Sequence, residues 1–303
     1  MSEACLIANP AAGRGRGARR LPALRDALAA VGITEVHLSR APGDERVLAT
    51  EAAQRGVRTI VALGGDGTWG NVARGILATG RDVRLVPVEA GTGNDFAYAM
   101  SLPARDSVAM AAIAAGTHDV RVDVGMANDD AVLNVAGTGF ATEALQASRR
   151  VRALSGPLVY VAAAVPLLRS YQPIRVVLQL DDEPRGEAVE YLAIVVSNGP
   201  RYGGGFRVAP RASVTDGKLD VTVVRDAGAL RRGVLLTRVR LGRHEGEPEV
   251  SQRLARRVRI HADDPPLFDA DGELHRAVEP TLDLRVLPGA IRVGVTADGD
   301  SPN

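Results

Sequence analysis

The sequence contains very little cysteine and lysine. Cys5 is its one cysteine, so the chain forms no internal disulfide and no zinc site made of several thiolates, which fits a reducing compartment. Lys218 is its one lysine, and no Gly-x-x-x-x-Gly-Lys-Ser/Thr motif occurs, so the ordinary P-loop enzymes are excluded. A phosphate group would therefore be held by arginine, by backbone N–H groups or by a metal ion.

Net charge and long apolar runs are also scarce. The formal net charge is +1, which argues against a dedicated nucleic-acid-binding protein. No stretch reaches the roughly 18 apolar residues that span a bilayer, and the first residues lack the basic region of a signal peptide. The mean hydropathy is near zero, and 303 residues are enough for about two globular domains. We expect a cytoplasmic protein whose membrane contact, if any, is peripheral.

Two glycine-rich turns dominate the first half of the chain. The first turn, residues 63–68, follows the apolar run 59–62, and the second, residues 91–96, follows the run 84–88. Each run is short, rich in aliphatic residues and ends at or near glycine, which predicts a buried parallel strand. Helix-compatible segments follow both turns. The turns should therefore lie at the carboxyl ends of neighbouring strands, where open α/β sheets bind ligands.

The residues of these turns suit a nucleotide and a metal ion. Glycines let backbone N–H groups approach an anion, threonine hydroxyls can contact phosphate or ribose, and aspartates offer the hard oxygens that Mg²⁺ prefers. Gly-Asp-Gly is also common in turns without any ligand, but two such turns after two buried strands favour the binding interpretation. The candidate nucleotide ligands are Gly64, Gly65, Gly67, Thr68, Thr92 and Asn94, and the candidate metal ligands are Asp66 and Asp95.

The two motifs together resemble a known family. Gly-Gly-Asp-Gly-Thr at 64–68 followed by Gly-Thr-Gly-Asn-Asp-Phe-Ala at 91–97 is similar to the catalytic domain of the diacylglycerol kinase and sphingosine kinase family of lipid kinases, especially its soluble bacterial branch. The first motif alone is also similar to NAD kinases and phosphofructokinases. The resemblance implies ATP and Mg²⁺ as cofactors and a lipid hydroxyl as acceptor.

The loop after the first apolar run, residues 4–8, admits two interpretations. Gly13-x-Gly15-x-x-Ala18 formally satisfies the dinucleotide fingerprint, but the first glycine lies too far from the strand, and Ser39-Arg40 stands where an acidic residue is needed. The loop instead resembles the Asn-Pro-x-x-Gly opening of the lipid kinases. The resemblance implies that Asn9 and Gly13 border the nucleotide phosphates and that Ser39 replaces a nucleotide-contacting threonine. It also places Asp123 where the family carries an acid linked through water to the metal network.

The pattern of the chain changes near residue 127. Before this point strands and helices alternate, which predicts a Rossmann-like or phosphofructokinase-like nucleotide-binding domain over residues 1–127, on which residues 288–303 could pack back. After it, alternating runs predict an antiparallel β-sandwich, a lipid-binding domain, over residues 128–287. The expected strands are 131–136, 174–180, 188–197, 206–209, 219–224, 258–262 and 282–287, and the expected helices are 141–152 and 157–170.

Two further motifs lie in the second half. Residues 198–221 follow the family order of Asn, Tyr-Gly-Gly-Gly, Ala-Pro and Asp-Gly-x-Leu-Asp-Val, although a glycine-rich hairpin explains them locally. By resemblance, Asp216 and the carbonyl groups of Ser213 and Lys218 hold a structural Mg²⁺. Asp-Gly-Glu at 271–273 could be a simple turn, but the resemblance implies that Asp271 is the catalytic base, with Glu273 beside it.

One departure from the family keeps a second class of function open. The family commonly continues Gly-Gly-Asp-Gly-Thr with an apolar residue, Asn and Glu, whereas this chain has Trp69-Gly70-Asn71. A missing glutamate could weaken a nucleotide or metal contact. The leading hypothesis is therefore an ATP- and Mg²⁺-dependent lipid kinase of the diacylglycerol kinase type. The alternatives are a degenerate kinase that senses nucleotide or lipid, and a soluble-substrate kinase such as an NAD kinase.

The partners expected from this hypothesis are ATP and a lipid at the membrane surface, without nucleic acid, and a homodimer is left open. The segment 230–241 combines leucine, valine and arginine amphipathically. We hypothesise that it contacts anionic lipid headgroups through Arg231 and Arg232, although a solvated face is the simpler interpretation.

Overall fold

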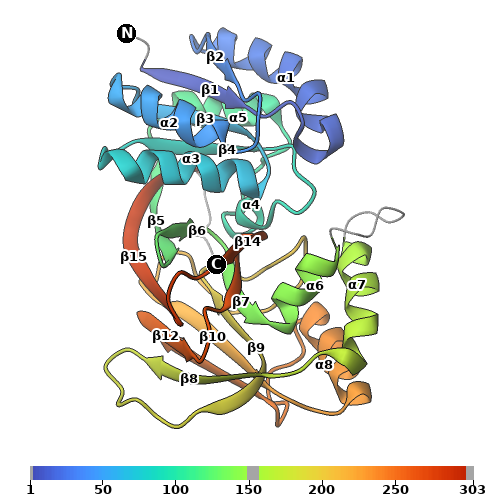
Figure 1. Cartoon of the computed structure of the whole chain (residues 1–303). Coiled ribbons are helices and arrows are strands. Elements are labelled where there is room, and N and C mark those ends of the chain that lie inside the picture. The colour runs from blue at the N-terminus through green and yellow to red at the C-terminus, as the bar shows by residue number, and fades with distance from the viewer. Residues whose placement is uncertain (1–2, 149–156, 298–303) are drawn as a thin grey trace. The chain divides into compact units, whose positions relative to one another are not determined.

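The computed structural model describes residues 3–148 and 157–297. These residues form two compact units (Figure 1). Unit 1 contains the chain up to Val124 together with the segment that begins at Pro288, and unit 2 contains Gly125–Leu287.

Unit 1 is a parallel α/β fold. Its elements are β1 (Ala4–Ala8), α1 (Ala12–Ala30), β2 (Glu35–Leu38), α2 (Asp44–Gln54), β3 (Thr59–Gly64), α3 (Asp66–Thr79), β4 (Arg84–Glu89), α4 (Asp95–Ala99) and α5 (Ser107–Ala115). The strands lie in the order β4-β3-β1-β2, and all neighbours are parallel. The chain passes from β1 to β2 on one side and then returns to β3 on the other. The topological switch point, where such sheets bind ligands, is therefore between β1 and β3.

The core of unit 1 lies on both faces of this sheet. On one face Leu24 of α1 and Met110 of α5 pack with Leu63 and Val86. Helices α2 and α3 cover the other face (Figure 1), where the indole Nε1 of the fully buried Trp69 donates to the carbonyl of Ala62 at 3.0 Å. The tryptophan that follows the first glycine turn thus anchors α3 to β3.

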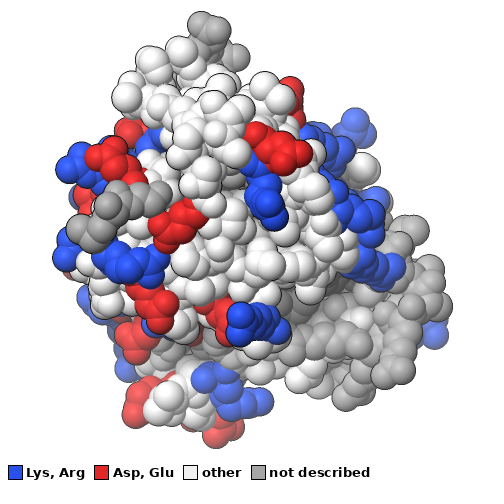
Figure 2. Space-filling model, turned by 90° about the horizontal axis from the view of Figure 1, so that it is seen from above, with Lys and Arg blue, Asp and Glu red and all other residues white. Residues whose placement is uncertain are grey.

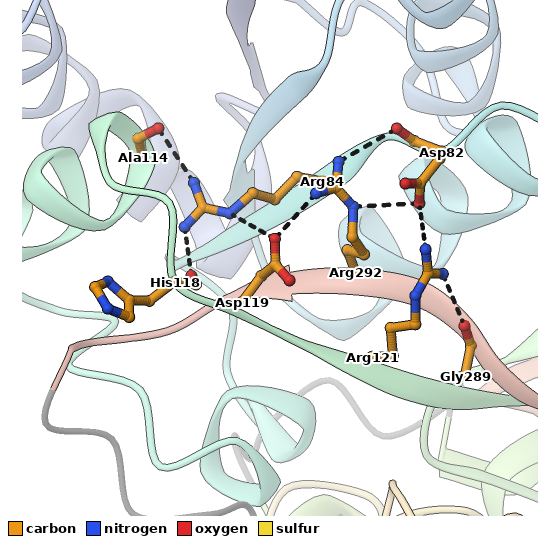
Figure 3. Close-up of polar contacts among 8 residues, drawn as sticks. All are labelled: Asp82, Arg84, Ala114, His118, Asp119, Arg121, Gly289 and Arg292. Carbon is orange, nitrogen blue, oxygen red and sulfur yellow. Dashed lines mark hydrogen bonds and ion pairs between the residues drawn. The ribbon is translucent and has the colours of Figure 1, made fainter.

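The last strand, β15 (Thr281–Gly294), completes unit 1 with its second half. Arg292 pairs in register with Arg84 of β4, and a polar network holds the two together (Figure 3). The guanidinium of Arg292 donates to Asp119 at 3.1 Å and contacts Asp82 at 3.2 Å. Arg84 is 4% exposed and donates to the carbonyls of Ala114 and His118.

Unit 2 is antiparallel. Its elements are the end of β5 (Asp119–Ala127), β6 (Asp130–Val132), β7 (Val135–Gly139), α6 (Phe140–Ser148), α7 (Pro157–Ser170), β8 (Ile174–Leu180), β9 (Val189–Ser197), β10 (Leu219–Arg225), α8 (Ala229–Leu241), β11 (Val250–Ala255), β12 (Arg257–Ala262), β13 (Leu267–Ala270), β14 (Glu273–Arg276) and the first half of β15. One edge of β9 pairs with β8 near its start and with β7 along the rest, and the other edge pairs with β10, so two sheets diverge along β9.

These two sheets enclose one core, to which Ile194, Val258, Phe268 and Leu282 belong. A second cluster lies under the helices, where Phe140 packs edge-on against Tyr171 with ring centroids 5.5 Å apart. The expected arrangement, a Rossmann-like α/β domain followed by an antiparallel sandwich, matches this architecture.

Several expected elements were wrong in detail. The strand predicted over 131–136 is two strands, because the N–H groups of residues 133–135 bind a side chain instead of a neighbouring strand. Residues 206–209 form no strand; Phe206 makes a single bridge to Tyr202. The helix predicted over 141–152 is described only to Ser148, and residues 149–152 lie outside the described part of the chain. Helix α2 and strands β11, β13 and β14 were not predicted.

The two arginines of the headgroup hypothesis, Arg231 and Arg232, both have carboxylate partners. Arg231 forms ion pairs with Glu247 and Glu249. Arg232 is 8% exposed, binds Asp226 at 2.7 Å and donates to the carbonyl groups of Leu168 and Tyr171. Arg232 is therefore buried in unit 2, whereas the Arg231 side chain is 33% exposed and already paired.

The surface carries charges of both signs. In the view of Figure 2, acidic and basic side chains are interspersed around a broad uncharged area, with basic groups more frequent along the right edge. Within the described residues, no helix combines the length and the apolar character that crossing a bilayer requires.

Candidate functional site

Four loops of unit 1 meet at the carboxyl edge of the parallel sheet, where the first candidate site lies. They follow β1, β2, β3 and β4 and contain Asn9, Ser39, Gly65 and Gly91. The N–H of Asn9 donates to the carbonyl of Leu63 at 2.9 Å, and the N–H of Ser39 donates to that of Ala8 at 2.9 Å. The structure therefore gathers Asn9, Ser39 and the first glycine turn at the switch point of the sheet.

The glycines of these loops are required by close packing. A Cβ atom on Gly65 would lie 2.7 Å from the Cα of Gly91, so the two glycine turns touch backbone to backbone. A Cβ on Gly13, which has φ +57°, would overlap the carbonyl oxygen of Ala90, and one on Gly64 would overlap the side chain of Thr68. By contrast, a Cβ on Gly67 would meet nothing within 4 Å. Gly67 thus borders open space, which suits an approaching phosphate.

A buried carboxylate lies behind these loops. Asn9 donates from Nδ2 to Glu45 at 2.8 Å and to the hydroxyl of Thr68 at 3.2 Å, and its Oδ1 accepts from the N–H groups of Ala11 and Ala12. Glu45 is 2% exposed, and its other oxygen accepts from Asn71 at 3.4 Å. Glu45 was not among the residues predicted from the sequence. The one sequence signal for it is its place in the first turn of α2, a helix that was not predicted.

The second glycine turn presents a buried polar atom without a partner. Asn94 has φ +58° and is 4% exposed, and among the described residues no group donates a hydrogen bond to its Oδ1. Its Nδ2 donates to the carbonyl of Gly91 at 3.2 Å. Beside it, Thr92 accepts from the guanidinium of Arg16 at 3.3 Å. A buried acceptor without a donor costs free energy unless a ligand satisfies it, so this turn fits a ligand that carries N–H or O–H groups, such as a nucleoside.

The two aspartates begin the helices that follow the turns. Asp66 is the first residue of α3, and its Oδ1 accepts from the N–H of Phe96 at 3.0 Å; Asp95 is the first residue of α4 and is 5% exposed. Asp123 of β5 is 2% exposed and accepts from the N–H of Gly289 at 2.7 Å.

These aspartates form no compact cage of their own. Within residues 3–148 and 157–297, the one group of three metal-ligand side chains with donor atoms inside 4.8 Å is Cys5, Glu35 and His37. Arg55 binds that Glu35 at 2.8 Å, and burial raises the pKa of Cys5 to about 12, so that cluster is a poor metal site. The hard oxygens of Asp66 and Asp95 suit Mg²⁺ held jointly with substrate phosphates.

In unit 2 the hairpin of β13 and β14 separates the two carboxylates of the Asp-Gly-Glu motif. Asp271 and Gly272 form its two-residue turn, both with positive φ, as Asp-Gly turns do. The Asp271 carboxylate accepts from the N–H groups of Leu133, Asn134 and Val135 at 2.7, 2.8 and 3.1 Å. Glu273 has a side chain that is 45% exposed and lies 4.0 Å from His275.

The loop that contains Asp216 was predicted to hold a structural metal ion. Its Oδ1 accepts from the N–H of Lys218 at 2.9 Å, across Gly217 with φ +70°, and Ser213 bonds to Thr215 through their hydroxyl groups. Burial, and then the charge of Asp216, raise the pKa of Asp220 to about 6. The carboxylate and carbonyl oxygens of this loop are donors that a divalent cation accepts.

An apolar cavity of unit 2 was not foreseen. It contains about 980 Å³ of empty space, open solvent included, and lies between the sheet and helices α6, α7 and α8. Phe140, Ala164 and Leu235 line it, together with the buried Asp269. Asp269 accepts from the hydroxyls of Tyr202 at 2.8 Å and Thr142 at 3.1 Å, and burial raises its pKa to about 7.

The two halves of the chain match two family descriptions. Residues 3–127 match the diacylglycerol kinase catalytic domain. Residues 134–295, more than half of the chain, match the YegS C-terminal NAD kinase beta sandwich-like domain. The chain belongs to the diacylglycerol kinase family of lipid kinases. As a member it is a phosphotransferase, and the resemblance inferred from the glycine motifs is confirmed.

Curated relatives and solved structures agree with this assignment. The chain is 28% identical over 276 residues to a diacylglycerol kinase of Bacillus subtilis, with 90% of each chain covered. It is 32% identical to a probable lipid kinase YegS-like protein of Chromohalobacter salexigens, over 70% of each chain. A crystal structure from Bacillus anthracis strain Sterne described as a diacylglycerol kinase has a TM-score of 0.74 at 23% identity and covers 98% of both chains. Because of that low identity, the likeness to the solved structure shows the fold alone.

Proposed function

We propose that this protein transfers the γ-phosphoryl group of ATP to the hydroxyl group of a diacylglycerol-like lipid, in a reaction that requires Mg²⁺. The observation that carries the proposal is the pair of glycine turns that touch at Gly65 and Gly91 and present the unpartnered Oδ1 of Asn94 at the carboxyl edge of the sheet. Unit 1 binds the nucleotide in this proposal, and unit 2 binds the lipid at a membrane surface.

The nucleotide is held mainly by backbone groups. The N–H groups of Gly64, Gly65 and Gly67 and the N-terminus of α3 bind the phosphates, since a helix N-terminus attracts anions. Thr68, Thr92, Asn9, Gly13, Ser39 and Asn94 complete the binding loops. Asp66 and Asp95 would hold Mg²⁺, which neutralises phosphate charge when bound. Asp123 supports unit 1 by accepting from the N–H of Gly289. The loop with Asp216 and the carbonyls of Ser213 and Lys218 would hold a second, structural ion.

The lipid is held by the cavity under α6, α7 and α8. Its lining is apolar apart from Asp269, Tyr202, Thr222 and Arg232, and burying acyl carbons there contributes about 0.8 kcal/mol for each CH₂ group. The neutral or weakly ionised Asp269 offers one polar group for the glycerol end of the lipid. A soluble acceptor such as NAD would bury few apolar groups in such a cavity. The cavity therefore disfavours an NAD kinase, although the family description of the second half names an NAD kinase beta sandwich-like domain.

The proton of the lipid hydroxyl is accepted by Glu273 in this proposal, and Asp271 has a positioning role. Three backbone N–H groups already bind the Asp271 carboxylate, so three of its roughly four acceptor positions hold residues 133–135. Glu273 is adjacent and more accessible. A positioned general base accelerates such a reaction typically by 10²–10⁴-fold.

The test is phosphoryl transfer by the purified protein with Mg²⁺, γ-labelled ATP and mixed micelles of diacylglycerol, phosphatidylglycerol, sphingosine or ceramide. We expect label in the diacylglycerol fraction, and none after chelation of divalent cations. ATP binding without label in any lipid would instead indicate the degenerate, nucleotide-sensing kinase that the Gly70-Asn71 departure suggests. If NAD is offered as the acceptor in place of the lipids, label in NAD would indicate the soluble-substrate kinase.

Two variants distinguish the catalytic roles of Glu273 and Asp271. Glu273→Gln is expected to lower kcat by about 10²-fold or more without changing the melting temperature. Asp271→Asn is expected to lower the melting temperature as well, because an amide cannot accept all three N–H groups. If Glu273→Gln keeps full kcat and Asp271→Asn alone abolishes it in a folded protein, Asp271 is the base. Glu279→Gln, an exposed carboxylate beyond the same hairpin, is the matched control.

A further inference from the structure

A basic pocket lies beside helix α8 in unit 2, outside the site described above. It contains about 780 Å³ of empty space, open solvent included, and is lined by Gly204, Gly205, Arg207, Arg240, Leu241 and Arg243. Of the described residues that line it, three are arginines and none is acidic. Such a pocket attracts an anion.

The arginines of this pocket differ from their neighbours in pairing. Arg211, Arg231, Arg232 and Arg238 of the same unit each form an ion pair with a carboxylate. Arg207, Arg240 and Arg243 form none within the described part of the chain. Three converging cations without counter-charges repel one another, and an anion in the pocket relieves that repulsion.

Packing holds two of these side chains in place. The guanidinium of Arg240 lies over the ring of Phe206, 5.8 Å from its centroid. The stem of Arg207 packs on Gly242, where a Cβ atom would come within 3.0 Å of it. Gly242 ends α8 with φ +67°, so the chain turns tightly there and brings Arg243 to the same pocket. Arginines fixed in this way lose little side-chain freedom when they bind a phosphate.

The pocket is continuous in sequence with the apolar cavity. Gly203, Phe206 and Val208 line the cavity, and the residues between them, Gly204, Gly205 and Arg207, line the basic pocket. On α8, Val239 lines the cavity and Arg240 the basic pocket. An amphiphile with an apolar tail and an anionic head fits two such neighbouring hollows, whereas a free phosphate uses only one.

Exposed apolar residues of α8 favour a membrane over a soluble anion as the ligand of the pocket. Leu241 is 51% exposed and lines the pocket, and Val234 and Leu230 on the same helix are 43% and 89% exposed. Exposed apolar side chains next to arginines are typical of helices that lie at a lipid–water interface.

We propose that Arg207, Arg240 and Arg243 form a binding site for the phosphate of an anionic phospholipid, through which unit 2 docks on a membrane. This goes beyond the proposed function, because the site needs neither ATP nor phosphoryl transfer. It replaces the earlier assignment to Arg231 and Arg232, whose guanidinium groups are already paired. Each arginine near an anionic surface contributes about 1 kcal/mol, so removing all three should weaken binding roughly a hundredfold.

The test is co-sedimentation of the full-length protein, without nucleotide, with vesicles of phosphatidylcholine alone or mixed with phosphatidylglycerol. The wild type is expected to bind only the mixed vesicles, and Arg207→Gln/Arg240→Gln/Arg243→Gln to lose that binding. The charge-matched control Arg253→Gln/Arg257→Gln/Arg285→Gln removes three exposed arginines that already pair with Glu183 or Asp283, and it should keep more of the binding.

Three outcomes would overturn the proposal. The first is equal loss of binding in both triple variants, which would indicate a diffuse charge effect. The second is retained binding by the pocket variant. The third is stabilisation of the wild type by inorganic phosphate, abolished in the pocket variant, together with no binding to mixed vesicles, because that would identify a site for a soluble phosphate. None of these binding measurements depends on kinase activity, so they test the pocket independently of the proposed phosphoryl transfer.

Discussion

Glu45 shows how one side chain can restore a charge that a motif lacks. The chain has Asn71 where the lipid kinases commonly carry glutamate, and a buried carboxylate from α2 reaches that asparagine. The same carboxylate orients Asn9, which in turn holds the start of the loop before α1. Because the charge comes from a different helix, the departure at residue 71 does not by itself indicate a degenerate kinase.

We predict that Glu45→Gln raises the KM for ATP about tenfold or more with a smaller change in kcat. The amide replaces an acceptor that faces two donors, and a hydrogen bond to a charged group contributes roughly 1.5–3 kcal/mol. Steady-state kinetics at saturating lipid measure the effect. Adding Asn71→Glu to Glu45→Gln should recover part of the loss, whereas Glu51→Gln, exposed on the same helix, should have none. An unchanged KM in Glu45→Gln would refute the positioning role.

Asp269 predicts a dependence of stability on pH. Burial raises its pKa to about 7 from 3.8, so between these values the folded protein keeps a proton that the unfolded chain releases. The contribution is fully present below pH 3.8 and is lost as the pH rises toward 7, by up to about 1.4 kcal/mol for each pH unit. Urea denaturation of Asp269→Asn should show a flatter profile between pH 5 and 7.5 than the wild type, while exposed Asp264→Asn should follow the wild type. Parallel profiles for wild type and Asp269→Asn would contradict the raised pKa.

At the scale of elements, the return of β15 to unit 1 depends on charged side chains. Arg84 on β4 and Arg292 on β15 share Asp119, and Arg292 and Arg121 share Asp82. Strands that are adjacent in this sheet but far apart in sequence are therefore linked by ion pairs at one end (Figure 3).

Arg84→Met is predicted to lower the free energy of unfolding by roughly 2–4 kcal/mol. The apolar side chain removes the guanidinium donor from the carbonyls of Ala114 and His118, of which His118 keeps the N–H of Val295, and it removes a partner of Asp119. Thermal and chemical denaturation measure the loss, with Arg81→Met, an exposed arginine of the preceding loop, as the control. Equal stability of the two variants would show that the network contributes nothing.

At the scale of the whole molecule, the chain enters unit 2 once and then returns to complete unit 1. Ile291 and Val293 of β15 are 1% and 0% exposed, and the N–H of Gly289 binds the buried Asp123. Unit 1 is therefore complete only when the last strand has been added.

We predict that a chain ending at Leu287 no longer binds ATP, whereas one ending at Val295 still does. The shorter chain loses two buried aliphatic side chains that contribute about 1.5–3 kcal/mol each, as well as the polar network of Arg292. The increase in melting temperature caused by Mg²⁺ and ATP is the measurement. A normal increase in the shorter chain would show that unit 1 folds without its last strand.

The sequence alone determined the elements whose pattern is local. Residues 4–8, 157–170 and 174–180 were placed at their observed bounds. The α/β half followed from glycine turns after aliphatic runs, the sandwich from alternating runs, and the family from the resemblance of the two glycine motifs. The same local logic failed at residues 131–136, where the Asp271 carboxylate, far along the chain, captures the backbone N–H groups and splits the strand.

Only the tertiary structure decided which charged side chains are buried and which are paired. The sequence could not show that Glu45 is buried behind the loop of Asn9, or that Asp269 lies in an apolar cavity. Nor could it show that Arg231 and Arg232 are paired while Arg207, Arg240 and Arg243 have no ion pair within the described residues. Each of these properties depends on what stands opposite a side chain in space, and burial and counter-charges come from residues distant in sequence. Motif and periodicity fix the backbone path, whereas the charge state and role of a side chain are set by its neighbours.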